Sequence, residues 1–367
     1  MKEGHRGTEA RRERNGSHRG HRGDRGTEDK GRTRRETDNK ATKGAEEGKG
    51  HYSTPSGWRS GGWVVFVSVF SVISVASVSS PDTSTLHAIV LGIAQDGGVP
   101  HIGCTQELCV RARQDPAQRQ RVACLGLVAG DKRFLVDATP DLPSQIESLN
   151  AGRTLADRAR PVDGILLTHA HIGHYAGLMY LGREALGARG VPVYATPRMA
   201  AFLRANGPWS QLVSLGNIDL HEIEPDRPFA LALGLSVTAI RVPHRDEYSD
   251  TVAFRIAGPG RTLLYVPDID KWDKWDHRLE DEVATVGVAL LDGTFESESE
   301  LPGRSLVEIP HPLVGETASR LAEKTRNADV RFIHLNHTNR LLWDEEARRA
   351  LRGRGFRVAA DGEDVPL

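Results

Sequence analysis

Short apolar runs and longer amphipathic segments alternate along the chain from residue 86 onward. The apolar runs are rich in Val, Ile and Leu, which is typical of β-strands. We expect strands at 87–94, 122–128, 133–137, 164–168, 191–194, 236–242, 251–256, 262–266, 286–291 and 330–335. The amphipathic segments predict helices at 141–150, 174–186, 197–206, 315–327 and 344–352. This alternation predicts one α/β layered domain over residues 86–367.

Residues 1–60 have a different pattern, because they are polar with very few large apolar side chains. The first 50 residues hold 15 Lys or Arg against 10 Asp or Glu. Such a segment cannot bury enough apolar surface to offset its ordering entropy, so we expect a disordered polar tail. Two interpretations of the tail stay open: a solvated part of the protein, or an upstream extension from a misplaced start codon.

Residues 61–80 form an isolated apolar segment with interleaved Ser, which ends in Val78-Ser79-Ser80. The segment is short for a membrane-spanning helix, and its small final residues are typical of a signal-peptide cleavage site. We therefore expect a signal peptide and a periplasmic or secreted mature protein without a stable membrane span. The alternative is a strand with Val/Ser alternation, in which case the protein would be cytoplasmic.

The formal net charge of the chain is −1. Binding to phosphate backbones normally needs a basic surface, so the charge argues against nucleic acid and favours a small-molecule substrate. The three cysteines are too few, and odd in number, for a disulfide framework. We interpret Cys104 and Cys109 as a buried or bridged pair rather than as two ligands of a structural zinc ion, since no further ligand stands at a recognisable spacing nearby.

Histidines and aspartates gather directly after the predicted strands. His169 and His171 follow 164–168, and their i, i+2 spacing in extended backbone places both imidazoles on one side. His174 comes from the first turn of the next segment. Side chains at strand ends are held rigidly while loops admit a substrate, and imidazole suits zinc, iron or manganese. The candidates for a metal site are His169, His171, His174, His244, Asp268, His334 and His337.

The segment that runs from Thr168 to Leu178, T-H-A-H-I-G-H-Y-A-G-L, resembles the T-H-x-H-x-D-H-x-x-G-L signature of the metallo-β-lactamase superfamily. Within the superfamily, residues 91–98, 137–141 and 334–339 are similar to the branch of pyrroloquinoline-quinone biosynthesis protein B. The resemblance covers the chain from residue 86 to its end. It implies an αββα sandwich of two mixed sheets with helices outside.

The resemblance also implies a ligand set. One ion would be held by His169, His171 and His244, and a second by His174, Asp268 and a late histidine. We prefer His334 as the late ligand because it stands at the strand end, and His337 remains the competitor. The resemblance implies zinc, in one or two ions, with iron or manganese as alternatives. Asp137 would orient the signature loop by hydrogen bonding.

One position departs from the signature, because Gly173 stands where the superfamily has an aspartate that ligates the second metal. Glycine offers no side-chain oxygen, so we expect either a single metal ion or another carboxylate in its place. The carboxylates that could substitute are Asp96, Asp141 and Asp246.

The function implied by the resemblance is a metal-dependent hydrolase, in which a metal-activated water attacks a small-molecule ester, lactone or phosphoester. An oxygen-dependent, oxidase-like activity stays open beside it. We expect Asp268, His311 and Tyr248 to take part in catalysis, the last two by stabilising an oxyanion. Two other classes remain: a non-catalytic or cofactor-biosynthesis-related metal- or quinone-binding protein with a degenerate site, and a nuclease similar to tRNA 3′-processing enzymes.

Overall fold

The computed structural model describes residues 86–305, 308–322 and 328–367, so the predictions for residues 1–60 and 61–80 lie outside the described residues. The strands of the described part form two sheets of seven strands each. The first has the order β14-β1-β2-β3-β4-β5-β6, and the second has the order β13-β12-β11-β10-β9-β8-β7. Both sheets are mixed, because parallel pairs such as β3–β4 and β10–β11 stand beside antiparallel pairs such as β1–β2 and β8–β9.

The first sheet contains β1 (Leu86–Gly92), β2 (Cys124–Ala129), β3 (Lys132–Val136), β4 (Gly164–Leu166), β5 (Val191–Ala195), β6 (Ile218–Glu222) and β14 (Asp364–Pro366). The second contains β7 (Phe229–Ala232), β8 (Leu235–Arg241), β9 (Val252–Ala257), β10 (Thr262–Val266), β11 (Val288–Asp292), β12 (Asp329–Ile333) and β13 (Arg357–Val358).

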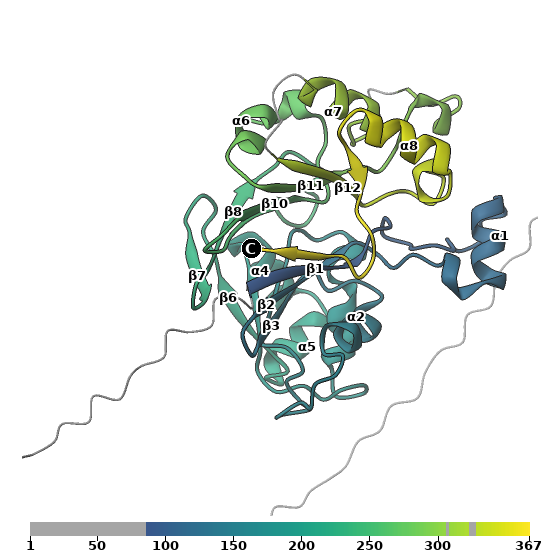
Figure 1. Cartoon of the computed structure of the whole chain (residues 1–367). Helices are drawn as coiled ribbons and strands as arrows, with labels where there is room; N and C mark the ends of the chain where they lie inside the picture. The colour runs from purple at the N-terminus through teal and green to yellow at the C-terminus, as the bar shows by residue number, and fades with distance from the viewer. Residues whose placement is uncertain (1–85, 306–307, 323–327) are drawn as a thin grey trace, which may run out of the picture. The chain divides into compact units, whose positions relative to one another are not determined.

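The helices lie outside the two sheets. They are α1 (Glu107–Gln114), α2 (Leu142–Leu149), α3 (Ile172–Tyr175), α4 (Pro197–Ala205), α5 (Trp209–Ser214), α6 (Leu279–Ala284), α7 (Val314–Leu321) and α8 (Glu345–Gly353). Figure 1 shows α6, α7 and α8 beyond the second sheet, and α2 and α5 beyond the first. The structure therefore confirms the αββα sandwich expected from the sequence.

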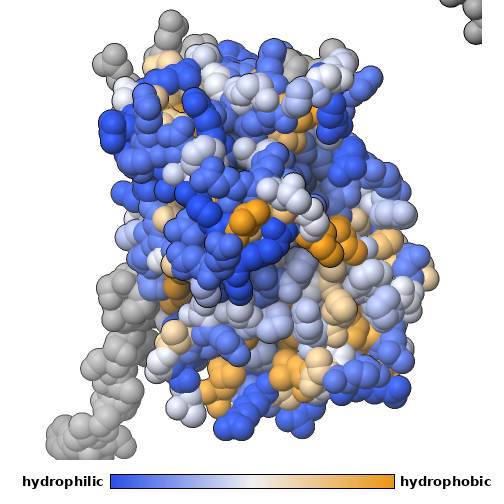
Figure 2. Space-filling model, turned by 90° about the vertical axis from the view of Figure 1, so that its right-hand side faces the viewer, coloured by the Kyte–Doolittle hydropathy of each residue, from blue (hydrophilic) through white to orange (hydrophobic). Residues whose placement is uncertain are grey.

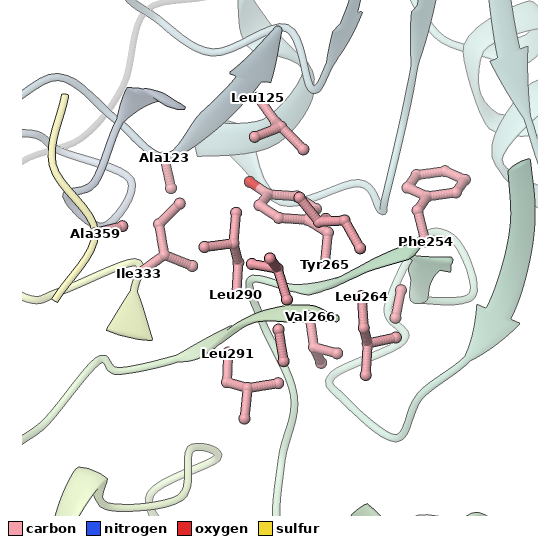
Figure 3. Packing of buried hydrophobic residues seen from close by; sticks show 14 of the residues in the cluster. Ala123, Leu125, Phe254, Leu264, Tyr265, Val266, Leu290, Leu291, Ile333 and Ala359 are labelled. Carbon is pink, nitrogen blue, oxygen red and sulfur yellow. The ribbon is translucent and has the colours of Figure 1, made fainter. Parts of the chain in front are cut away.

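The main core lies between the two sheets. Figure 3 shows Leu125 of β2 pointing toward Tyr265 of β10 and Leu290 of β11. All three side chains are fully buried. Strands such as β11, in which every residue is buried, read as continuous apolar runs because both of their faces are covered. This packing holds the strand ends rigidly, which is the condition for positioning chemical groups on them.

The helix expected over 174–186 is wrong. The chain instead forms the short helix α3 and then a 3₁₀ segment, Ala176–Leu181. The main chain here bonds to the loop after β3, since Ala138 N donates to His174 O and Gly177 N donates to Ala138 O, both at 2.8 Å. These tertiary hydrogen bonds replace the bonds that a continuous helix would make. The strands β6, β7, β13 and β14 and the helices α1, α5 and α6 were not predicted.

The surface of the described part is mixed in character. The face shown in Figure 2 is mostly hydrophilic, with hydrophobic residues in separate groups. Large apolar side chains that are exposed include Ile102, Ile172 and Leu233. Among the described residues, no helix combines the length and the apolar character that crossing a membrane requires.

The two sheets are joined at one edge by the ends of β1 and β12. Gln95 N donates to Leu335 O at 2.9 Å, and Leu335 N donates to Ile93 O at 2.8 Å. The loop that follows β1 is thereby fixed beside the residues that follow β12. This edge of the sandwich carries the candidate site.

Candidate metal centre

The side chains of the site stand within a few residues of strand ends, as the sequence predicted. Residues of this kind follow β1, β3, β4, β8, β10, β11 and β12. The pairing of these strands directs their carboxyl ends toward one edge. The side chains so placed are Asp96, Asp137, His169, His171, His244, Asp268, Asp292 and His334.

Three histidines and one aspartate converge in a first group. His169 Nε2 lies 2.9 Å from His171 Nδ1, which in turn lies 3.2 Å from His244 Nε2. Asp268 Oδ2 lies 3.2 Å from both His169 Nε2 and His244 Nε2. One ligand atom of each residue lies within 4.8 Å of all the others. Three imidazole nitrogens with an open side are the ligand set of a catalytic zinc ion, so these residues fit the metal.

A second group lies directly beside the first. His174 Nε2 is 3.8 Å from Asp268 Oδ2, and Asp96 Oδ1 lies 3.6 Å from His334 Nε2. The atoms Asp96 Oδ1, His174 Nε2 and His334 Nε2 are buried, and within the described part none of them has a hydrogen-bond partner. Buried polar atoms are costly to leave without a partner, so a shared ligand such as a metal ion fits this group as well.

The outward ring nitrogens of the ligands are held by hydrogen bonds. His174 Nδ1 donates to Asp137 Oδ2 at 2.8 Å, and Thr168 Oγ1 donates to Asp137 at 2.9 Å. The same hydroxyl accepts from His169 Nδ1 at 2.9 Å. With Nδ1 protonated in this way, the Nε2 lone pairs of His169 and His174 face the site. Asp137 therefore occupies the orienting position that the resemblance implied.

Two further hydrogen bonds that hold outward ring nitrogens were not predicted from the sequence. His334 Nδ1 donates to Thr294 Oγ1 at 3.0 Å, and that hydroxyl donates to Asp292 Oδ1 at 2.7 Å. His171 Nε2 donates to Glu247 Oε2 at 3.1 Å. Asp292 directly follows the predicted strand 286–291, as the predicted ligands follow theirs, so its position was a usable signal. Glu247 lies in a loop with no pattern that marks it.

The pKa shifts of two residues in the first group, Asp268 and His169, suit metal binding. Burial would raise the pKa of Asp268, but the nearby His311 and His244 hold it well below its usual range. Burial, together with the neighbouring His174, lowers the pKa of His169 well below that of an ordinary histidine. An ionised carboxylate and a neutral imidazole are the forms that bind zinc.

Of the two residues expected to stabilise an oxyanion, the structure brings only His311 to the group. His311 is buried, and its Nδ1 lies 2.9 Å from Asp292 Oδ2 and 3.3 Å from Asp268 Oδ1. Tyr248 is 61 % exposed, and its ring packs 5.3 Å from that of Phe202. Among the described residues, no hydrogen bond joins Tyr248 to the histidines. The catalytic role predicted for Tyr248 therefore has no support in the geometry.

His337 lies apart from both groups, which corrects its place among the main ligands. Its Nδ1 lies 3.8 Å from Cys109 Sγ, and its ring stacks on that of His101 with centroids 4.3 Å apart. Ligand atoms of Cys104, Cys109 and His337 lie within 4.8 Å of one another. Both cysteines are free thiols, so the bridged pair is also corrected. A third side chain that could bind a metal beside these cysteines therefore comes from the far end of the chain.

Residues 132–335 match the family described as the beta-lactamase superfamily domain. This stretch is more than half of the chain, and the chain belongs to the metallo-β-lactamase superfamily, as its fold and histidine cluster also indicate. Within this superfamily, the chain is 30% identical over 311 residues to coenzyme PQQ synthesis protein B of Methylobacterium sp. (strain 4-46). That match covers 77% of this chain and 100% of the relative.

Two solved structures share the fold. The Zn²⁺-bound PqqB from Methylobacterium extorquens superposes with a TM-score of 0.64 and 24% sequence identity, over 77% of this chain and 100% of the other. A diphosphatase from the PhnP family superposes with a TM-score of 0.56 and 22% identity, over 77% of this chain and 99% of the other. At these identities the likeness shows the fold alone.

Proposed function

We propose that the protein is a metal-dependent hydrolase that acts on a small-molecule ester, lactone or phosphoester. The observation that carries the proposal is the convergence of His169 Nε2, His171 Nδ1 and His244 Nε2 on Asp268 Oδ2. The superfamily match and the Zn²⁺-bound relative support zinc as the ion, with iron or manganese as alternatives. The net charge of −1 supports a small substrate over nucleic acid.

When bound, zinc acidifies a coordinated water toward neutrality and polarises the oxygen of an ester or phosphoester. The residues of the chain would hold the ion and handle the proton. His169, His171 and His244 would hold the ion through nitrogens whose orientation the surrounding loops fix. Asp268 stays ionised, and His311 Nδ1, 3.3 Å from Asp268 Oδ1, holds a proton beside it. Asp268 and His311 are therefore placed to accept or return a proton at Asp268 Oδ1.

The test is elemental analysis of the pure protein together with assays on a panel of esters, lactones and phosphodiesters. We expect bound zinc or iron and hydrolysis of at least one substrate class, and in a His169→Ala, His171→Ala double variant we expect a strongly reduced metal content and the loss of hydrolysis. His221→Ala is the matched control, because His221 is an exposed histidine of β6 that pairs with Asp219. Protein that neither contains nor takes up a transition metal contradicts the proposal.

A second candidate function has one specific observation in its favour, which is the match to the whole length of a coenzyme PQQ synthesis protein. In this alternative the protein serves the synthesis of a quinone cofactor and does not hydrolyse the panel. Rescue of a strain that lacks the relative, by a chain inactive on every panel substrate, would support it. Hydrolysis by the parent protein favours the first candidate.

A further inference from the structure

Gly173, which stands in place of the signature aspartate, packs directly against Asp96. A Cβ built on Gly173 would lie 2.2 Å from Asp96 Oδ1 and 2.6 Å from Asp96 Cα. Real Cβ atoms essentially never approach other atoms so closely. The carboxylate of Asp96 therefore fills the space that a side chain at position 173 would need.

The main chain fixes Asp96 in this place. Gln95 N donates to Leu335 O, which ties the residue before Asp96 to the residue after His334. The loop then closes in a tight turn, in which Gly98 N donates to Gln95 O at 2.7 Å and Gly98 has a φ of +63°. A positive φ suits glycine, so the turn depends on that residue. Asp96 thus reaches the site from a hydrogen-bonded turn that follows β1.

The atoms that face Asp96 are imidazole nitrogens, which are able to bind a metal ion. Its Oδ1 lies 3.4 Å from His174 Nε2 and 3.6 Å from His334 Nε2. Both imidazoles donate through Nδ1, to Asp137 and Thr294, so as neutral rings they present lone pairs to the carboxylate. Three acceptors facing one another repel unless they share a cation. Two atoms held about 2.1 Å from a tetrahedral zinc ion lie about 3.4 Å apart, which matches these separations.

The other carboxylates that could replace the signature aspartate are engaged elsewhere. Asp141 Oδ2 accepts from Val122 N at 2.8 Å. Asp246 Oδ1 accepts from Thr251 Oγ1 at 3.0 Å. Within the described part, ligand atoms of Asp96, His174 and His334 lie within 4.8 Å of one another, and neither of these two carboxylates belongs to such a group.

We propose that Asp96 is a ligand of a second metal ion, with His174, His334 and Asp268, and so replaces the aspartate of the signature from a different loop. Gly173 is then required rather than merely tolerated, because any side chain there would displace Asp96. The inference rests on the proposed function, since it needs a metal centre, and it makes that centre dinuclear.

The experiment locates metals by anomalous diffraction and counts them by elemental analysis in three proteins: the parent, Asp96→Ala, and Asp246→Asn as the control. We expect the parent to show one peak among His169, His171 and His244 and a second between His174 and His334. Asp96→Ala keeps the first peak and loses the second, with affinity for the second ion reduced roughly 100-fold or more. Asp246→Asn keeps both.

Three results would contradict the inference. A second peak that persists at full occupancy in Asp96→Ala refutes Asp96 as a ligand. A parent protein with only the first peak refutes the inference but leaves the proposed function standing. In that case a protonated His174 between Asp137 and Asp96 explains their proximity, and NMR titration of its ring would show it. No peak at either position overturns both the inference and the proposed function.

Discussion

Asp137 and His174 form a hydrogen bond of 2.8 Å between Oδ2 and Nδ1, and both side chains are fully buried. Asp137 has a φ of +73°, one of three positive values at non-glycine residues in the described part. A left-handed backbone costs free energy for a residue with a side chain. It is retained here because the same carboxylate also accepts from Thr168 N and Oγ1. One residue thereby sets the course of the signature loop and the ring orientation of His174.

We expect Asp137→Asn to weaken zinc binding by roughly 10- to 100-fold, the usual effect of removing a group that orients a ligand. Asparagine tolerates a positive φ, so the fold should survive the exchange. Its amide cannot accept every hydrogen bond that the carboxylate accepts, and the Nε2 of His174 becomes less basic. Competition with a chelator measures the affinity, and the exposed Asp219→Asn is the control. Unchanged zinc affinity in Asp137→Asn would show that the buried bond does not serve the metal.

Gly177→Ala tests how closely the signature segment packs on the loop after β3. A Cβ at this position would lie 2.0 Å from Thr139 O and 2.8 Å from Ala138 O, which are backbone atoms that cannot rotate away. We expect the variant to lose about 1–3 kcal/mol of unfolding free energy, the cost of overpacking, and to bind zinc more weakly because Asp137 moves. Denaturant unfolding measures the loss.

Gly353→Ala is the control for that measurement. Gly353 ends α8, and a Cβ there would meet nothing within 4 Å. Alanine reduces the conformational entropy of the unfolded chain, so this variant should be as stable as the parent or slightly more stable. If both variants unfold alike, close packing at Gly177 is not what holds the loop.

The parts of the structure that could be predicted are those with local causes. Buried strands read as apolar runs, and the residues after them follow directly in the chain. His169, His171, His244 and Asp268 were found in this way, and the structure brings all four together. His334 was preferred over His337 on the same ground, and it lies in the site.

The parts that could not be predicted depend on contacts between distant segments. The helix expected over 174–186 is interrupted because its backbone bonds to the loop at Ala138, which no local propensity records. From the sequence, Asp96 was one of three equal candidates to replace the signature aspartate. Only its packing against Gly173 distinguishes it from the other two. Cys109 and His337 are 228 positions apart, so no spacing rule could join them.

Cys104, Cys109 and His337 lead to a prediction about a separate metal. Two thiols and an imidazole within 4.8 Å of one another provide three of the four ligands of a structural zinc ion. We expect the reduced protein loaded with cobalt to show thiolate-to-metal charge-transfer absorption. A Cys104→Ser, Cys109→Ser double variant should lose this absorption and about one equivalent of metal, while the histidine cluster keeps its metal. Absorption that survives the double variant would place the thiolate ligand elsewhere, on Cys124.

The final prediction concerns the dependence of stability on pH. Asp329, at the start of β12, accepts hydrogen bonds from Arg331 Nη2 at 2.6 Å and from Arg357 Nη2 of β13 at 2.9 Å. Burial would raise the pKa of Asp329, but these two arginines hold it below the ordinary value of 3.8. A carboxyl with a lowered pKa in the folded state stabilises the fold above the unfolded pKa, and this contribution is lost as the pH falls through the folded value.

We therefore expect the parent protein to keep this contribution above about pH 4 and to lose it progressively in more acidic solution. Asp329→Asn should be less stable than the parent at pH 7, and the difference should shrink as the pH approaches 3. Urea unfolding between pH 3 and pH 7 measures both slopes. Asp281→Asn removes an exposed carboxylate of α6 that pairs with Arg278, and this variant should follow the parent curve. A constant difference between Asp329→Asn and the parent at every pH would mean that the substitution acts through packing, and that the charge of Asp329 does not clamp β13 to β12.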